Sequence, residues 1–178
     1  MKKLLKERER SVDTAKVARG MARYLVFATA DTELLYKAAL AHDAGYLMLD
    51  RDKLKRILGK TSLAEDDYRF IRSHARKGLE YFKGVQVPQA IRDAILSHHE
   101  RNDGSGYPRG LTAPKIPLFA KLIGVAETFV ALTSTRPYRE KLGAESALAV
   151  VRGGIGRSFD KEHVDALTEM VRHAGESP

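Results

Sequence analysis

Apolar residues recur every three or four positions along most of this 178-residue chain, which is the spacing of one face of an α-helix. The period-two alternation of half-buried strands is missing. The spacing predicts seven helices: about 12–28, from Asp31 or Thr32 to Gly45, about 65–82, from Pro88 through His99, from near Ile116 through Ala131, about 143–152 and about 161–173. The sequence therefore predicts a single all-α helical bundle over residues 1–178, with 104–114 as its longest irregular loop.

The absence of cysteine limits both the location and the chemistry of the protein. It excludes disulfides and thiolate metal sites, and it fits a reducing compartment. No apolar run approaches the roughly 18 residues of a membrane-spanning helix. The charged start MKKLLKERERSV lacks the apolar stretch of a signal peptide. We therefore expect a cytoplasmic protein that does not insert into membranes.

The charge balance is basic, with 31 lysines and arginines against 23 aspartates and glutamates and a formal net charge of +8. Such a balance favours an anionic partner such as a nucleotide. The basic residues are spread along the whole chain, and no known nucleic-acid-binding module is present. We therefore do not expect nucleic acid to be the partner.

Four polar residues interrupt the apolar stripes of four different predicted helices: His42, His74, His98 and Glu127. Residues on such a stripe face the core, where a polar group costs free energy unless it is hydrogen-bonded or binds a metal. A single buried histidine is commonly a hydrogen-bonded core residue. Helical bundles, however, build metal sites from inward side chains on facing helices. The four residues together predict a metal centre inside the bundle.

Two of these histidines precede a second potential ligand. Asp43 follows His42, and its two oxygens can each bind a different ion. His99 follows His98, and neighbouring side chains lie about 100° apart around a helix, so both reach one ion only if it sits between their directions. Because thiolates are absent, the ligands are imidazole and carboxylate, which favour iron, manganese, zinc or nickel over calcium or magnesium.

The predicted ligands favour a particular reaction. Two ions about 3.5–4 Å apart would lower the pKa of a bridging water and neutralise charge on a phosphoryl group under attack. The sequence has neither a Walker-type phosphate loop nor a serine nucleophile elbow. Metal-assisted hydrolysis of a phosphoester is the chemistry that these residues favour.

Five segments occur in the order and register of HD-GYP domains: HDAGY (42–46), RSHARKG (72–78), LSHHERNDGSGYPRGL (96–111), IPLFAKLIGVAETFVALTS (116–134) and TRPYRE (135–140). The chain resembles this family over nearly its whole length. HHE and DGSGYP followed by RPYR are far more specific than a histidine–aspartate pair alone. The family is an all-α branch of the HD phosphohydrolase superfamily, so the resemblance implies an HD-domain-like bundle.

The resemblance also implies an activity and its cofactors. Active HD-GYP domains are phosphodiesterases with two or three metal ions, usually iron or manganese, that cleave cyclic di-GMP to the linear dinucleotide and on to GMP. For this chain it implies two metal sites that share Asp43. One would be formed by Asp43, His74, His98 and His99. The other would be formed by His42, Asp43 and Glu127.

The GYP element, Gly106, Tyr107 and Pro108, is associated in the family with partner contacts and with shaping the site. On physical grounds Gly104 and Gly106 permit positive φ and Pro108 fixes a turn. Tyr107 is either a loop anchor or part of a docking surface for a protein partner, and both interpretations stay open.

The chain departs from the family pattern at four places. Asp13 stands where a first-helix histidine is usual, so it is the candidate oxygen ligand that would complete the site of His42. Tyr46 replaces a lysine that would contact substrate phosphate. Glu127 is one methylene longer than the usual aspartate, and the segment 129–132 lacks its aspartate. The site that contains Asp13 should therefore bind metal more weakly than the other.

Arg136 and Arg139 lie in TRPYRE, the segment that supports phosphate contacts in the family. We expect Arg136, Arg139 and Tyr46 to bind substrate and Asp43, Arg136 and Tyr46 to act in catalysis. The alternative for the two arginines is a pair of surface salt bridges.

Two functions are open on this sequence. The first is a slow cyclic-dinucleotide phosphodiesterase, most simply one that cleaves cyclic di-GMP. The second is a degenerate domain that binds a cyclic dinucleotide or a signalling protein without cleavage. A homodimer is compatible with either, and because such domains often follow a sensor or receiver, the chain is compatible with a piece of a longer protein.

Overall fold

The computed structural model describes residues 2–135 and 140–174, which contain helices but no β-strand. The helices of these ranges are α1 (Lys2–Tyr24), α2 (Thr29–Ala41), α3 (Arg51–Ile57), α4 (Glu65–Arg72), α5 (His74–Tyr81), α6 (Gln89–Ser97), α7 (Leu118–Thr133), α8 (Ala144–Arg152) and α9 (Lys161–Ala174). Two 3₁₀ segments accompany them, η1 (Ala44–Met48) and η2 (Ala113–Lys115). The predicted all-α fold is confirmed. None of the described helices is long and apolar enough to cross a membrane.

Some predicted boundaries differ from the observed ones. The helix predicted over 65–82 is two helices that meet at Ser73, whose hydroxyl donates to the Phe70 carbonyl at 2.6 Å. Such a local bond competes with regular helix geometry. The short helix α3 was not predicted, although Asp50 caps it by accepting the Lys53 amide at 2.6 Å. The predicted helix 12–28 begins at Lys2 and ends at Tyr24, and Val26 beyond its end has a φ of 56°.

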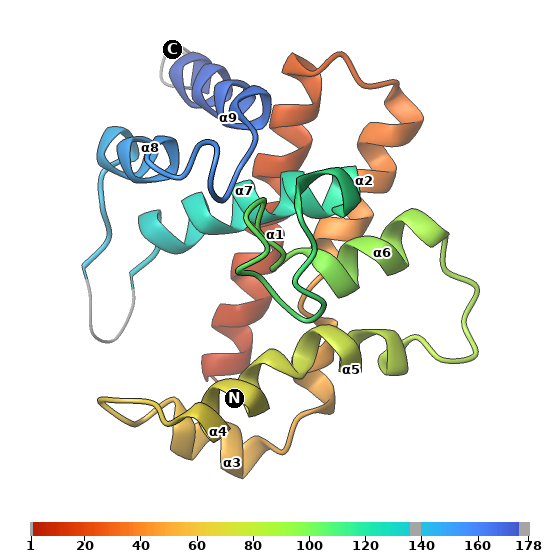
Figure 1. Cartoon of the computed structure of the whole chain (residues 1–178), viewed down its shortest axis with the longest axis vertical. Coiled ribbons are helices and arrows are strands. Elements are labelled where there is room, and N and C mark those ends of the chain that lie inside the picture. Colours follow the sequence, from red (N-terminus) through yellow and green to blue (C-terminus); the bar gives the residue numbers. More distant parts are fainter. Residues whose placement is uncertain (1, 136–139, 175–178) are drawn as a thin grey trace.

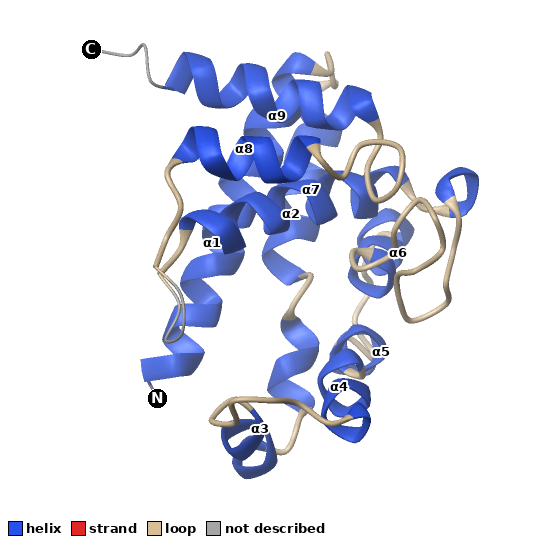
Figure 2. Ribbon diagram, turned by 60° about the vertical axis from the view of Figure 1, so that its left-hand side comes forward, coloured by secondary structure: helices blue, strands red, loops and turns tan. Residues whose placement is uncertain are grey.

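The helix α7 runs through the middle of the bundle (Figure 1). Leu122, Ile123 and Val125 on it are fully buried, as expected for a helix that is apolar on most sides. It packs against α1, α6, α8 and α9, while α1 also packs against α2. Figures 1 and 2 both place α8 and α9 at one end of the molecule and α3 and α4 at the other.

The apolar stripes of two helices lead directly to predicted site residues. On α2, the buried residues Leu35, Ala38 and Ala39 are followed by His42, which is 1% exposed. On α6, the buried residues are Ile91, Ala94 and Ile95, and the stripe continues to the fully buried His98. Both helices end as the site begins, so the same periodic pattern builds the core and carries the histidines into it.

Gly45 allows η1 to lie directly against α5. A β-carbon at this position would collide with the carbonyl oxygen of His74 and lie 2.6 Å from the amide nitrogen of Gly78. Since both contacts are backbone atoms, neither can swing aside. Asp43 and His74 therefore owe their proximity partly to this missing side chain.

We expect Gly45→Ala to destabilise the metal-free protein by about 3 kcal/mol, because overpacking against rigid backbone is costly. It should also weaken Mn²⁺ binding by displacing Asp43 from His74. Gly143→Ala is the matched control, since a β-carbon there meets no atom within 4 Å. Thermal unfolding and Mn²⁺ titration measure both effects. Equal stability and Mn²⁺ affinity in the two variants would contradict the close contact between η1 and α5.

Candidate metal centre

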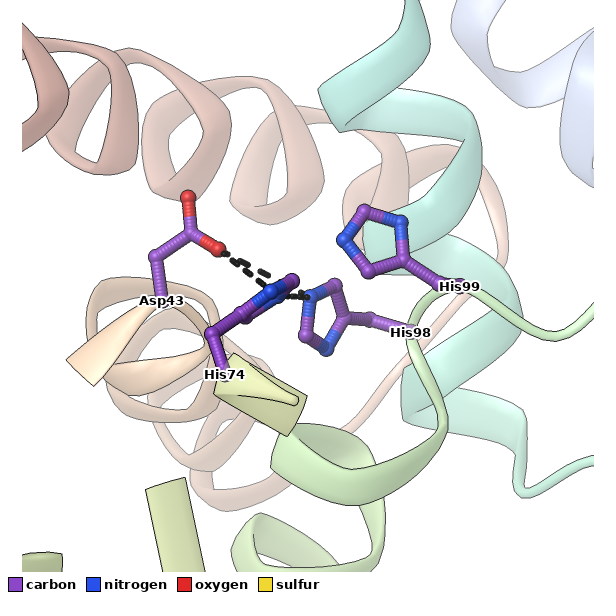
Figure 3. A group of neighbouring side chains, drawn as sticks. All are labelled: Asp43, His74, His98 and His99. Carbon is purple, nitrogen blue, oxygen red and sulfur yellow. Dashed lines mark hydrogen bonds and ion pairs between the residues drawn. The ribbon is translucent and has the colours of Figure 1, made fainter. Parts of the chain in front are cut away.

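Four predicted ligands from three separate segments meet at one point of the bundle (Figure 3). Asp43 follows α2, His74 begins α5, and His98 and His99 follow α6. One ligand atom from each of the four lies within 4.8 Å of the others. The α6 helix ends one residue before His98. His99 lies beyond the regular helix, and the two rings are 4.1 Å apart between their centres.

Three histidines of the centre share one orientation. Each places its Nδ1 against the backbone carbonyl three residues earlier: His42 on Ala39, His74 on Ile71 at 2.7 Å and His98 on Ile95 at 2.8 Å. A carbonyl only accepts, so Nδ1 carries the proton in each ring. Nε2 is then the atom of each ring that faces the centre, and a ring can bind metal there once this atom carries no proton. Backbone bonds of this kind fix the ring orientation that a metal ligand needs.

A second group of potential ligands adjoins the first and consists of His42, His98 and Glu127. Asp43 lies between the two groups. Its Oδ2 is 3.3 Å from His42 Nε2, and its Oδ1 is 3.4 Å from His74 Nε2. Each carboxylate oxygen therefore faces a different set of imidazoles, which is the arrangement of a bridging ligand.

The donor atoms of the centre fit divalent metal ions. His42 Nε2, Asp43 Oδ1 and Glu127 Oε2 are buried and have no hydrogen-bond partner, which is costly unless another group satisfies them. His74 Nε2 and His98 Nε2 lie 3.3 Å apart. With both Nδ1 atoms protonated, two lone pairs face each other, and a cation between them would relieve the repulsion. Nitrogen and oxygen donors without sulfur suit iron, manganese, zinc or nickel.

Charges within the centre set its protonation. Burial alone would lower the pKa of His42, but the Asp43 carboxylate, with Glu127, raises it to about 9. Burial would raise the pKa of Asp43, yet His42, His98 and His74 together outweigh it and hold that pKa well below its usual value. Burial lowers the pKa of His74 to about 4, and burial with His98 and His74 lowers the pKa of His99. At neutral pH His74 and His99 are thus neutral and able to bind metal.

The irregular loop 104–114, which carries the GYP element and is called the GYP loop below, contacts the centre through Tyr107. Its ring stacks on His99 with the ring centres 4.5 Å apart and the planes 27° apart. Burial raises the pKa of its hydroxyl, and the negative charges of Glu127 and Asp43 raise it further. Of the two interpretations of Tyr107, this contact supports an anchored loop whose tyrosine closes one side of the site.

The GYP loop passes close to the backbone of the metal ligands at Gly106. A β-carbon on Gly106 would meet the backbone of the ligand segment, including the His99 carbonyl at 2.5 Å. Pro108 lies toward the surface, where its carbonyl accepts a bond from Arg76 at 3.3 Å. The loop therefore needs glycine where it crosses the metal ligands.

Two residues that support the centre were not predicted. Glu100 is 4% exposed, and its carboxylate accepts the backbone amides of Arg109 and Leu111, both at 2.8 Å. Arg101 donates to the carbonyls of His98, at 3.1 Å, and Glu100. Both residues directly follow His98 and His99 in the sequence, and this adjacency could have indicated that they support the centre.

Tyr46 lies over one ligand of the centre. Its ring stacks on His74 with the ring centres 4.3 Å apart and the planes 9° apart. Glu127 approaches from α7, with its Oε2 3.6 Å from His99 Nδ1. The structure therefore brings two of the four altered motif positions, Tyr46 and Glu127, to the centre.

Asp13 is the predicted ligand whose position contradicts its role. Its side chain is 55% exposed, and its carboxylate lies 3.9 Å from Lys16 on the outer side of α1. The neighbouring Thr14 is buried instead, and its Oγ1 has no hydrogen-bond partner. Adjacent helix positions differ by about 100° in direction, so packing decides which of the two faces inward. The predicted residues Arg136 and Arg139 lie outside the described residues.

The family model described as "HD domain" matches residues 1–163 of this chain. The cyclic di-GMP phosphodiesterase response regulator RpfG of Xanthomonas campestris is 38% identical over 156 residues, covering 85% of this chain and 40% of that protein. The 3'3'-cGAMP-specific phosphodiesterase 3 of Vibrio cholerae is 33% identical over 151 residues, covering 85% of this chain and 32% of that protein. The chain thus spans less than half the length of these curated relatives.

A solved structure with a similar fold is Bd1817, described as a HDG"Y"P protein from Bdellovibrio bacteriovorus. Its TM-score is 0.72 at 20% sequence identity, and the match covers 92% of this chain and 51% of that one. At this identity the similarity shows the fold alone, and it agrees with the all-α architecture described above.

Proposed function

Because this chain belongs to the HD domain family and to its HD-GYP group, we propose that it is a metal-dependent phosphodiesterase that hydrolyses a cyclic dinucleotide, with cyclic di-GMP as the first candidate. The observation that carries the proposal is the pair of adjoining ligand groups, which share His98 and have Asp43 between them. Relatives named for cyclic di-GMP and for 3'3'-cGAMP support a cyclic dinucleotide as the substrate class. They leave open which nucleobases the substrate carries.

The predicted cofactors fit these groups. Asp43, His74, His98 and His99 would hold one divalent ion, and His42, Asp43 and Glu127 would hold a second, since the single free nitrogen of His98 can bind only one of the two ions. We propose iron or manganese for both. When bound, such ions supply Lewis acidity and a nucleophilic water at neutral pH.

Hydrolysis consumes one water for each bond that is cut. A new bond joins the water oxygen to phosphorus, the bond from phosphorus to the leaving 3'-oxygen breaks, and that oxygen takes a proton. The chain itself would orient the phosphodiester, and Tyr46 and Tyr107 would exclude bulk water from the side of His74 and His99. We keep Arg136 and Arg139 as proposed contacts of the non-bridging oxygens, in line with the family motif.

The degenerate-domain alternative is less favoured. One ligand group retains every residue that the family motif supplies, in a geometry that can hold an ion. Loss of Asp13 from the centre affects only the group that contains His42. The predicted protein partner at the GYP loop and the predicted homodimer stay predictions.

The proposal is tested by product analysis. Protein purified with added Fe²⁺ or Mn²⁺ is incubated with cyclic di-GMP, 3'3'-cGAMP and cyclic di-AMP, and the products are separated by chromatography. We expect at least one of them to give a linear dinucleotide or mononucleotide, slowly, and to stay intact with chelator. Complete survival of all three with metal-replete protein over hours would contradict the enzyme. Direct titration with the same nucleotides would then test the binding module.

A further inference from the structure

Arg72 lies beside the metal centre although it is not a metal ligand. It is the last residue of α4 and stands two positions before His74. Its guanidinium carbon is 5.4 Å from the centre of the Tyr107 ring and 5.5 Å from that of Tyr68. Because Tyr107 also stacks on His99, a single aromatic ring contacts both this cation and a candidate ligand.

The charge of Arg72 is exposed and uncompensated. Its side chain is exposed to solvent, and among the described residues it forms no ion pair with a carboxylate. Arg69, one turn earlier on the same helix, is paired with Asp66 at 2.8 Å. The two aromatic contacts hold the guanidinium in place without neutralising it.

The other arginines around the GYP loop already donate to oxygen atoms of the chain: Arg101 to the His98 and Glu100 carbonyls, Arg76 to the Pro108 carbonyl and Arg109 to the Ser97 hydroxyl. Arg101 is also largely buried, and burial lowers its pKa. Among these four arginines, Arg72 is the one whose contacts with other described residues are with aromatic rings alone. Its donors are therefore free for a ligand.

We propose that Arg72, held by Tyr68 and Tyr107, forms an anion-binding subsite at the edge of the metal centre that takes a phosphate group of a nucleotide. A guanidinium presents a planar set of donors that matches two phosphate oxygens at once. The nearby tyrosines carry no charge at neutral pH, so this cation offsets the charge of the substrate at that edge. The inference rests on the proposed function for its ligand class.

GMP is the probe, because it carries one phosphate and contains no phosphodiester to be cut. Guanosine, which has the same base and sugar without phosphate, is the ligand control. Arg72→Gln, Arg72→Lys and the matched surface control Arg69→Gln are compared with the unsubstituted protein, each loaded with Mn²⁺. Mn²⁺ affinity is measured for every variant, to separate loss of the subsite from disturbance of the centre.

We expect Arg72→Gln to weaken GMP binding by about tenfold, the lower range for loss of a charge-assisted contact. Arg72→Lys keeps the charge without the planar donors, so its GMP affinity should lie between that of Arg72→Gln and that of the unsubstituted protein. Guanosine binding and Mn²⁺ affinity should not change, and Arg69→Gln should match the unsubstituted protein throughout. For a cleaved dinucleotide, Arg72→Gln should raise KM more than it lowers kcat.

The inference is overturned if GMP binds equally well to the unsubstituted protein and Arg72→Gln, or if it binds to neither. It is also overturned if guanosine binding falls as much as GMP binding, because Arg72 would then contact the base or only support Tyr107. Failure of the proposed function looks different: no cyclic dinucleotide is cleaved, whatever the effect of Arg72→Gln on GMP. Cleavage with unchanged GMP binding would keep the function and reject the subsite.

Discussion

Replacing His98 with alanine should abolish metal binding at the group of Asp43, His74, His98 and His99 and, with it, hydrolysis. His98 belongs to both groups, is fully buried, and has its Nε2 3.3 Å from that of His74. Loss of a residue that only hydrogen-bonds to a metal ligand typically lowers activity by roughly 10- to 100-fold. Because His98 is itself a candidate ligand, we expect a larger fall in activity for His98→Ala. The metal-free protein should lose only about 1–2 kcal/mol of stability, because the cavity cost is partly offset by removal of the repulsion between the two Nε2 atoms.

His173→Ala is the matched control for His98→Ala. His173 is an exposed histidine on α9, far from either ligand group in sequence. Its ring bonds the Glu169 carbonyl at 2.8 Å and lies 5.6 Å from the Tyr24 ring between the ring centres. Bound Mn²⁺ per chain, cleavage rate and thermal unfolding without metal are measured for both variants. If His98→Ala retained both ions and the full rate, the centre would not be where these residues meet.

Tyr46→Lys should accelerate hydrolysis. Tyr46 stacks on His74, and its phenol carries no charge at neutral pH, so it stabilises a phosphoryl group less than an ammonium would. A charge-assisted contact contributes about 1.5–3 kcal/mol, which corresponds to roughly a ten- to hundredfold increase in kcat. The lysine also gives up the ring that covers His74, so the gain should lie nearer the lower figure.

Tyr46→Phe is the control for Tyr46→Lys. It keeps the stacked ring, removes only the hydroxyl and adds no charge, so comparing the two variants isolates the effect of the added charge. We expect its rate to lie at or below that of the unsubstituted protein. Steady-state cleavage with both variants fully loaded with Mn²⁺ gives the comparison. A rate for Tyr46→Lys no higher than for Tyr46→Phe, at equal metal content, would show that position 46 does not contact the substrate.

Much of the centre could be predicted from helical periodicity. His42 and His98 each extend a stripe of buried apolar residues, so their inward direction follows from spacing alone. The spacing on α1 was less informative, since Asp13 and Thr14 are adjacent and both polar. Their directions depend on how α1 packs against α2 and α7, and the structure turns Thr14 inward and Asp13 outward.

The contacts of the GYP loop could not be predicted from local pattern. Tyr107 reaches His99 because the loop folds back over the ligand segment, and the Glu100 carboxylate accepts two backbone amides from the later part of the loop. These contacts depend on the conformation of the whole loop. The break between α4 and α5 at Ser73 was not predicted either, because neither glycine nor proline stands there to indicate the end of a helix.

The most direct test of a metal-dependent hydrolase is to couple metal occupancy to cleavage. Metal-free protein is titrated with Mn²⁺, and bound Mn²⁺ per chain and the rate of cyclic di-GMP cleavage are measured in the same samples. We expect no cleavage without metal, and a rate that rises with occupancy and saturates at two ions per chain. Cleavage that does not depend on bound metal, or intact cyclic di-GMP at full occupancy, would contradict this account.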